Sequence, residues 1–228
     1  MTPRMHIALF DLDHTLLPLD SDYSWGSFTT RLGWTDPVEF DRQNEVFFQH
    51  YQAGTLDIHA YVRFATRAVR ERSPDEVQRA QAQFMREVIE PQIRPAARAL
   101  IEGHRQAGHE VVIVTATNAL VTRPIATAFG VEHLIAVELE HNAAGQLTGG
   151  IAGTPSFREG KVARVEAWLA ARGASWETVH TTFYSDSTND LPLLNKATVP
   201  VATNPSPALR AVARERQWRI LDLFAEHA

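Results

Sequence analysis

An α/β fold built on a parallel sheet is predicted by three short apolar runs, at 6–10, 111–114 and 181–184. Each run is rich in β-branched or aromatic residues, and each ends in a polar cluster, DLDHT, TATN or SDSTND. Continuous apolar strands that alternate with helical stretches are typical of a parallel sheet covered on both faces. The sequence therefore predicts a Rossmann-like core with helices on both faces of its sheet.

The segments between these strands carry helix and turn signals. Helices are expected at 94–106, 118–129 and 161 to about 172, and each is followed within two residues by a glycine that can end it. The stretch 137–153 differs, because two strand-like pieces flank the small residues Ala143-Ala144-Gly145. We interpret it as a β-hairpin.

The region after the first strand is different, because it has little strand signal up to position 92. Within it, Ser73-Pro74-Asp75-Glu76 is a strong helix start, since serine can cap, proline suits the first turn and Glu76 can close a capping box. Four helices are predicted here, at about 21–32, 37–53, 57–72 and 74–90.

This helical block is too long to be a simple connection. A crossover between parallel strands needs only a dozen or so residues, whereas the block has about 75. We therefore expect an all-helical domain inserted at 18–92, and an α/β core formed by 1–17 and 93–228.

Composition excludes several classes of protein. The 228 residues are 44% hydrophobic, include no cysteine and carry a net charge of −5. Disulfides and thiolate metal sites are therefore excluded, and a general nucleic-acid binder is disfavoured because it needs a basic face. No signal-peptide core or stretch of ~20 apolar residues occurs. We expect a soluble, cytoplasmic protein that binds neither nucleic acid nor membrane.

The polar clusters define a candidate site, because ligands of an open parallel sheet bind beyond the carboxyl ends of its strands. Four carboxylates in one cleft repel each other unless a cation lies among them, and hard oxygen ligands suit Mg²⁺. A lysine at a helix start, a hydroxyl and helix N-termini would face an anion, and phosphate is the anion most compatible with Mg²⁺. The residues that would converge are Asp11, Asp13, Thr115, Lys161, Asp186 and Asp190.

The two acids of DLDHT can then divide the chemistry. Asp11 can attack phosphorus and form an aspartyl-phosphate. Asp13 can protonate the leaving alkoxide and later take a proton from the hydrolytic water. A D-x-D pair alone is more often a solvated turn, and a calcium loop is excluded because Leu16 occupies the position that needs glycine.

DLDHT, VIVTAT, the helix-opening Lys161 and YSDSTND together resemble the four motifs of the haloacid dehalogenase (HAD) superfamily, in order and in spacing, over the whole chain. Within it, the chain looks most like the phosphoserine-phosphatase-like branch (HAD-IB), which has a helical cap of the C1 type. The resemblance implies a phosphatase with Asp11 as nucleophile and Asp13 as acid/base. It also implies Mg²⁺ held by Asp11, the backbone carbonyl of Asp13 and Asp186. The remaining implied residues are Thr115, Lys161 and Asn189 on phosphate, with Asp190 supporting the site from close by.

The resemblance is weaker at the residues that would determine substrate specificity. Phosphoserine phosphatases carry a glutamate shortly after the first motif, and here Asp20 stands at that spacing with Asp22 nearby. Arg63 and Arg67, which we place on one helix face, are candidates for contacting a substrate carboxylate. The expected substrate is a small phosphorylated metabolite, with phosphoserine and histidinol phosphate both open.

Three other functions remain open at this point. Phosphoryl transfer to an alcohol other than water would use the same intermediate. A phosphoacceptor signalling domain also combines acids, a threonine and a lysine around Mg²⁺, but it is about half as long and lacks the helical insertion. A metal-dependent glycosyltransferase would use D-x-D but leaves Lys161 and SDSTND unexplained. The sequence does not indicate an oligomeric state.

Overall fold

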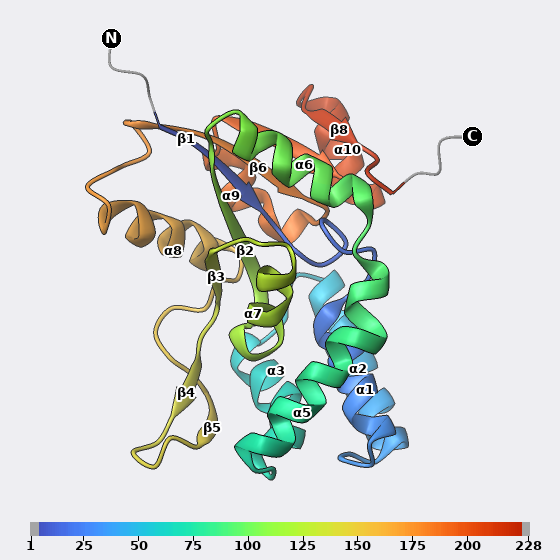
Figure 1. Cartoon of the computed structure of the whole chain (residues 1–228). Coiled ribbons are helices and arrows are strands. Elements are labelled where there is room, and N and C mark those ends of the chain that lie inside the picture. Colours follow the sequence, from blue (N-terminus) through green and yellow to red (C-terminus); the bar gives the residue numbers. More distant parts are fainter. Residues whose placement is uncertain (1–4, 225–228) are drawn as a thin grey trace.

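A computed structural model describes residues 5–224 of the chain. Its main sheet has six strands, all parallel, in the order β3-β2-β1-β6-β7-β8 (Figure 1). The strands are β1 (Met5–Phe10), β2 (Glu110–Asn118), β3 (His133–Val137), β6 (Val179–Ser185), β7 (Val199–Thr203) and β8 (Arg219–Leu221). The central position of β1, between β2 and β6, brings the three predicted strands together.

Helices cover both faces of this sheet, as the sequence predicts. Alternate residues of β1 point to opposite faces: Ala8 and Phe10 join one apolar cluster with α6 and α7, whereas Ile7 and Leu9 join another with α8, α9 and α10. The helices of the core are α6 (Pro95–Gln106), α7 (Ala119–Ala128), α8 (Glu159–Ala170), α9 (Leu191–Lys196) and α10 (Pro207–Glu215), with a 3₁₀ turn η3 (Thr188–Asp190).

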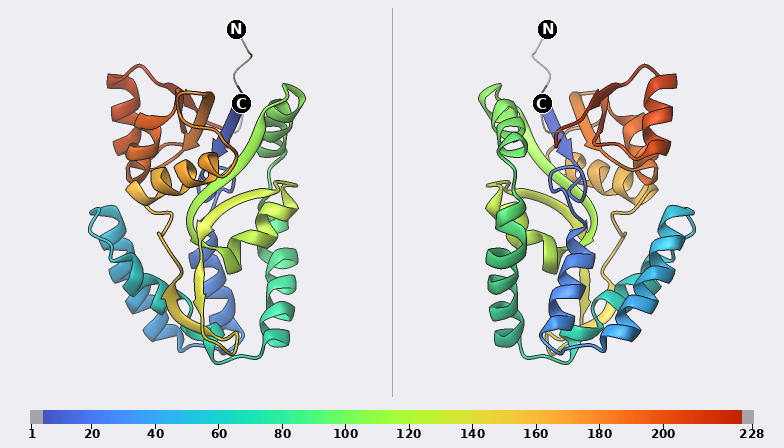
Figure 2. Two further views of the ribbon diagram at one scale, coloured as in Figure 1. Left: turned by 90° about the vertical axis from the view of Figure 1, so that its left-hand side faces the viewer. Right: turned by 90° about the vertical axis from the view of Figure 1, so that its right-hand side faces the viewer.

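The insertion after β1 is a helical cap that lies beyond one end of the sheet (Figures 1 and 2). The capping box at Ser73 and Glu76 is confirmed, with both of its hydrogen bonds present. The cap consists of α1 (Ser21–Arg31), α2 (Pro37–Gln52), α3 (Ile58–Ala65), α4 (Arg67–Arg70) and α5 (Pro74–Phe84), followed by a π-helical turn η1 (Met85–Ile89) and a 3₁₀ turn η2 (Glu90–Gln92).

Two helix predictions for the cap are wrong in detail. The helix expected at 57–72 is divided at Thr66, whose hydroxyl donates to Val62 O at 2.7 Å, a bond that bends helices. The helix expected at 74–90 ends as α-helix at Phe84 and continues as η1. The division at Thr66 changes where the arginines of this region lie.

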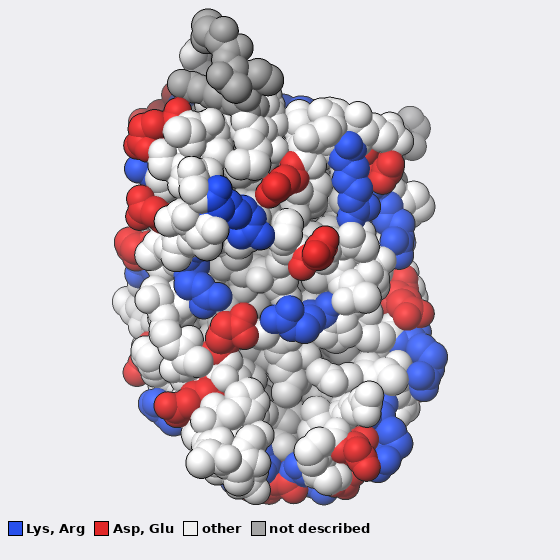
Figure 3. Space-filling view, turned by 60° about the vertical axis from the view of Figure 1, so that its left-hand side comes forward, with Lys and Arg blue, Asp and Glu red and all other residues white. Residues whose placement is uncertain are grey.

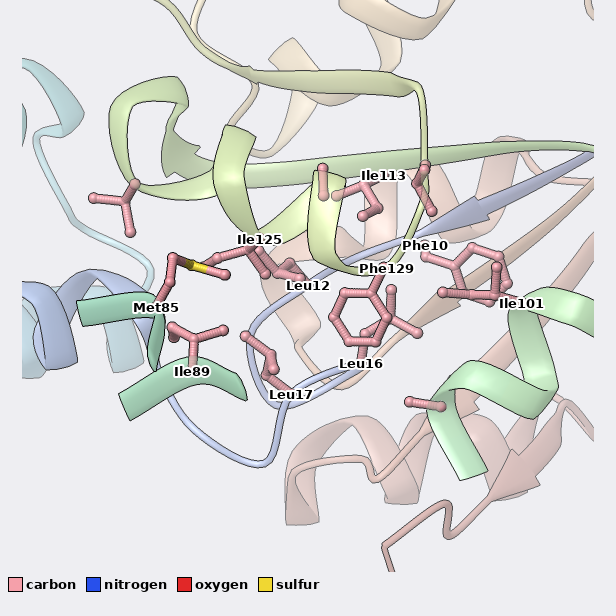
Figure 4. Close-up of a cluster of buried hydrophobic side chains, with 14 of the residues drawn as sticks. Phe10, Leu12, Leu16, Leu17, Met85, Ile89, Ile101, Ile113, Ile125 and Phe129 are labelled. Atoms are coloured by element: carbon pink, nitrogen blue, oxygen red, sulfur yellow. The ribbon is translucent and has the colours of Figure 1, made fainter. Parts of the chain in front are cut away.

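Cap and core share one apolar cluster rather than forming separate cores. Leu16 and Leu17 after β1, together with Met85 and Ile89 of η1, pack with Ile125 of α7 (Figure 4). The same cluster reaches α1 and α5 through buried aromatic side chains, Trp25, Phe28 and Phe84. The α1–α5 side of the cap is therefore joined to the core by dense apolar packing.

The predicted hairpin forms from β4 (Leu139–His141) and β5 (Leu147–Ile151), which pair antiparallel. It extends from the core beside the cap (Figure 1), where Leu139 of β4 and Val137 of β3 pack with Val62 of α3. Arg70 of α4 also donates to Thr148 O at 3.4 Å. The hairpin is therefore a second apolar connection between core and cap.

The face of the molecule drawn in Figure 3 intersperses Lys and Arg with Asp and Glu and shows no broad field of one sign. This mixture agrees with a net charge of −5. Among residues 5–224, none of the helices combines the length and apolar character needed to cross a bilayer.

Candidate active site

Asp11 and Asp186 face each other at the carboxyl ends of neighbouring strands. Asp11 follows β1 and its N–H donates to Tyr184 O of β6 at 2.9 Å, while Asp186 follows β6 directly. The Thr15 hydroxyl lies 3.3 Å from Asp11 Oδ2 and 3.4 Å from Asp186 Oδ1, so the two carboxylates lie on either side of one hydroxyl. Burial raises the pKa of both carboxyls, and the charge of Asp11 raises that of Asp186 further.

Lys161 lies buried between two acids at the start of α8. Its Nζ is 2.8 Å from Asp11 Oδ1 and 2.7 Å from Asp190 Oδ1. Ser185 Oγ also donates to Asp190 Oδ2 at 2.8 Å. Burial opposes the charged ammonium, but the two carboxylates outweigh it and raise the pKa of Lys161. The sequence predicts that one metal cation offsets the charges of all four acids. In the structure, the charge of Asp190 is balanced by Lys161 instead.

The Asp13 carboxylate points to the cap side of the site. It accepts from Ser21 N of α1 at 2.9 Å and from the Thr117 hydroxyl at 2.7 Å. Burial, together with the charge of Asp20, raises the pKa of Asp13 to about 6. A carboxyl group with a pKa near neutrality is suited to both giving and taking a proton.

The donor set fits Mg²⁺ through two carboxylates rather than three. In the described part of the chain, no three His, Asp or Glu side chains come together as metal ligands, and the Asp13 carboxylate is bonded to Ser21 N and the Thr117 hydroxyl. Mg²⁺ in proteins commonly uses one or two carboxylates and keeps several waters or phosphate oxygens. Asp11 and Asp186 supply such a pair, with the backbone carbonyl of Asp13 as an additional hard oxygen close by in the chain.

Thr115 lies inside β2 rather than just after it, because the strand continues to Asn118 through a register irregularity. Its hydroxyl accepts from Thr117 N at 3.1 Å, and its carbonyl accepts from Ser156 Oγ at 2.5 Å. Asn118, which the sequence did not single out, caps α7 through Val121 N. The end of β2 therefore connects Thr115 both to α7 and to the segment that precedes Lys161.

Asn189 lies where the cap meets the core. Its Nδ2 donates to the carbonyl of Tyr51 at 3.3 Å, and the Tyr51 hydroxyl donates to Ser187 Oγ at 3.2 Å. Burial and the charges of Asp186, Asp190 and Asp11 all raise the pKa of Tyr51. Sequence reasoning missed Tyr51, because nothing in its local pattern marks a contact with a segment more than a hundred residues later.

Asp22 is the more buried of the two acids proposed for substrate choice. Asp20 is half-buried and caps α1 by accepting from Tyr23 N, whereas Asp22 is only 7% exposed. Asp22 accepts from Asn118 Nδ2 at 3.2 Å and bonds to the Tyr61 hydroxyl. Burial and the charge of Asp20 raise the pKa of Asp22 to about 7. Tyr61 and Asn118 are the residues here that the sequence did not reveal.

Arg63 and Arg67 do not share one helix face, contrary to our expectation. The break at Thr66 puts Arg63 on α3 and Arg67 on α4, and both are exposed. Arg67 lines a cavity inside the cap, beside Phe40 and Phe64. Among the described residues, neither guanidinium has a hydrogen bond or ion pair with the acids of the site.

Comparison with known proteins identifies the family to which the chain belongs. A family model for haloacid dehalogenase-like hydrolases matches residues 8–195, and the chain belongs to that family. It is a phosphatase, and its relatives include a histidinol-phosphatase and a phosphoserine phosphatase. A phosphoacceptor signalling domain and a glycosyltransferase are therefore set aside.

Individual relatives agree with this assignment. The chain is 40% identical over 218 residues to a histidinol-phosphatase from Neisseria meningitidis serogroup C, covering 95% of this chain and 98% of that protein. It is 30% identical to the phosphoserine phosphatase SerB1 of Mycobacterium tuberculosis, covering 94% of this chain and 70% of that one.

Solved structures show the same fold. A protein of unknown function from Bordetella pertussis Tohama I is 48% identical, with a TM-score of 0.91 over 97% of this chain and 100% of that chain. A substrate-bound phosphoserine phosphatase is 17% identical, with a TM-score of 0.68 over 97% of this chain and 94% of that chain, which is a likeness of fold alone.

Proposed function

We propose that the protein hydrolyses a small phosphomonoester that carries a cationic group, with histidinol phosphate as the favoured substrate and with Mg²⁺ as cofactor. Asp11, Asp186 and the Asp13 carbonyl would hold the metal, which when bound supplies positive charge beside the transferring phosphoryl group. The observation that supports this proposal most strongly is the pairing of Asp11 with Lys161 on one side and its closeness to Asp186 on the other.

In the proposed reaction, Asp11 attacks phosphorus while the bond from phosphorus to the leaving alkoxide breaks. Lys161 holds Asp11 Oδ1 at 2.8 Å, which orients the carboxylate. Asp13 gives its proton to the leaving alkoxide and then takes one from the water that cleaves the aspartyl-phosphate. Phosphate leaves, and both acids return to their starting states.

The cationic group of the substrate is inferred from Asp22. This carboxyl is buried close to Asp13 and Asp20, and no salt bridge in the described residues involves it. A buried carboxylate without a counter-ion is unfavourable, so an ammonium or imidazolium group would stabilise it. Histidinol phosphate has such groups and lacks a carboxylate, which agrees with the finding that, among the described residues, neither Arg63 nor Arg67 has a hydrogen bond or ion pair with the acids of the site.

The test is a comparison of histidinol phosphate, phosphoserine and p-nitrophenyl phosphate, each with and without EDTA. We expect EDTA to abolish turnover and histidinol phosphate to give the highest kcat/KM. Asp11→Asn should lose turnover of all three substrates. Metal-independent activity, or equal activity in Asp11→Asn and wild type, would remove the mechanism.

Asp22→Asn tests the recognition of the cation. We expect kcat/KM for histidinol phosphate to fall roughly 10- to 100-fold, the range for losing a charge-assisted hydrogen bond, while p-nitrophenyl phosphate is little affected. Asp57→Asn is the matched control, because Asp57 is an exposed cap acid whose role as N-cap of α3 asparagine can keep. Equal losses on both substrates would contradict this role of Asp22.

A further inference from the structure

One edge of the cap is joined to the core mainly by polar contacts, together with one ring contact between Tyr51 and Phe157, whose centroids lie 6.4 Å apart. The α1–α5 side shares the main apolar cluster with the core, and α3 packs on the β4–β5 hairpin. By contrast, the end of α2 and the turn after it meet the core through Tyr51 with Ser187 and Asn189, and through Gly54. Because polar contacts exchange readily with water whereas apolar packing does not, this edge is the one where the cap can separate from the core.

Arg158 makes the contact through Gly54. Its guanidinium NH1 donates to the Gly54 carbonyl at 2.7 Å, which joins the start of α8 to the turn after α2. The ends of α2 and α8 are neighbours in both views of Figure 2. Gly54 has φ +68 and presents its carbonyl from a turn in which the N–H of Gly54 bonds to Tyr51 O.

The backbone of Arg158 is in a conformation that few residues with a Cβ adopt. Its φ of 52 and ψ of −120 lie outside the regions allowed to most L-residues. Such conformations persist only where the surrounding contacts hold them, and they concentrate at functional sites. The contact between Arg158 and Gly54 is one of the contacts that can hold it.

The segment 154–161 contains Lys161 and contacts Thr115, which are two of the three residues expected to bind phosphate. Ser156 is buried and donates to the carbonyl of Thr115 at 2.5 Å, and Lys161 N bonds to Arg158 O at 3.1 Å. The segment is folded so tightly that a Cβ on Gly160 would lie 2.0 Å from Pro155 O. A displacement of Arg158 would therefore be passed on to Lys161 rather than absorbed locally.

We propose that Arg158 is a positioning residue that couples closure of the cap to the placement of Lys161. When the α2 edge lies on the core, Gly54 holds the Arg158 side chain, and the strained backbone sets the first turn of α8 so that Lys161 reaches Asp11. When that edge separates, Arg158 loses its acceptor and the first turn of α8 is free to relax. The site is thus assembled only under a closed cap. This inference rests on the proposed function, because its assay uses histidinol phosphate as the substrate.

Two substitutions separate the side chain from the backbone. Arg158→Ala removes the guanidinium and keeps the strain, whereas Arg158→Gly removes the guanidinium and also accepts a positive φ without cost. Arg164→Ala is the matched control, because Arg164 also lies on α8 and donates to a carbonyl, that of Thr154, at 3.0 Å. Its ion pair is with Glu138, and among the described residues no hydrogen bond or ion pair joins it to the cap.

The readouts are kcat/KM for histidinol phosphate, the melting temperature and hydrogen exchange of residues 53–57. We expect both Arg158 variants to lose about tenfold in kcat/KM, as for a charge-assisted hydrogen bond, and to exchange faster at 53–57. Arg158→Gly should melt at a higher temperature than Arg158→Ala and yet be no more active. Arg158→Lys should recover part of the activity, and Arg164→Ala should match wild type in activity and exchange.

Wild-type kcat/KM and exchange in Arg158→Ala would overturn the proposal, as would equal losses in Arg158→Ala and Arg164→Ala, which would indicate general loosening of α8. If wild type cleaves p-nitrophenyl phosphate but not histidinol phosphate, only the proposed substrate fails. The role of Arg158 is then decided by hydrogen exchange at residues 53–57 and by comparing the activity of wild type and the Arg158 variants on p-nitrophenyl phosphate.

Discussion

Replacing Asp22 by asparagine should make the protein more stable, and increasingly so as pH rises. The Asp22 carboxyl is 7% exposed, and its pKa is raised from its ordinary value of 3.8 to about 7, first by burial and then by the charge of Asp20. Ionisation is therefore easier in the unfolded chain than in the folded protein. Between these two pKa values, the contribution of Asp22 to the free energy of unfolding falls as pH rises.

The size of the effect follows from the two pKa values. Each pKa unit corresponds to about 1.4 kcal/mol, so above pH 7 the ionisation of Asp22 lowers the free energy of unfolding by about 4 kcal/mol. About 2.5 kcal/mol of this loss develops between pH 5 and pH 8. Asparagine has no charge to bury and can keep bonds to Tyr61 and Asn118. The stability difference between Asp22→Asn and wild type should therefore grow by about 2.5 kcal/mol over this interval.

Urea unfolding of both proteins at pH 5, 6, 7 and 8 measures this difference. Asp57→Asn serves as the control, because Asp57 is exposed and its pKa is lowered, chiefly by the hydrogen bond from Ala60 N. Its substitution should show no such rise. A difference for Asp22→Asn that stays constant with pH, or that falls, would refute the argument that Asp22 is a buried acid without a counter-ion.

Three further predictions concern stability. Lys161→Met leaves two buried carboxylates unpaired and should lower the free energy of unfolding by about 3–5 kcal/mol in urea; a loss below about 1 kcal/mol would contradict the pairing. Ser73→Ala breaks the capping box of α5 and should lower the free energy of unfolding by about 1 kcal/mol in the same assay. Unchanged stability would show that the capping box does not stabilise α5. Burial and the charge of His109 lower the pKa of His104, so stability should fall as pH drops below about 6.5. His104→Gln should reduce this fall between pH 7 and pH 5, and equal slopes would count against it.

Much of the fold was predictable because its signals are local. The three central strands contain apolar runs that are followed by polar clusters beginning at Asp11, Thr115 and Ser185, and the capping box and the hairpin turn are set by adjacent residues. The outer strands β3, β7 and β8 were not predicted. They have only three to five residues each, which is too short for a clear pattern, and β7 also contains Pro200, a residue that weakens a strand signal.

The sequence by itself determined which acids meet, because the carboxyl ends of parallel strands lie at one edge of a sheet and thereby place Asp11 beside Asp186. Only the tertiary structure decided how the side chains point and what they bond. It turned the Asp13 carboxylate towards Thr117, separated Arg67 from Arg63, and joined Arg158 to Gly54 across 104 positions of chain. Such contacts depend on loop conformation and on side-chain rotamers in three dimensions, which the spacing of residues along the chain does not encode.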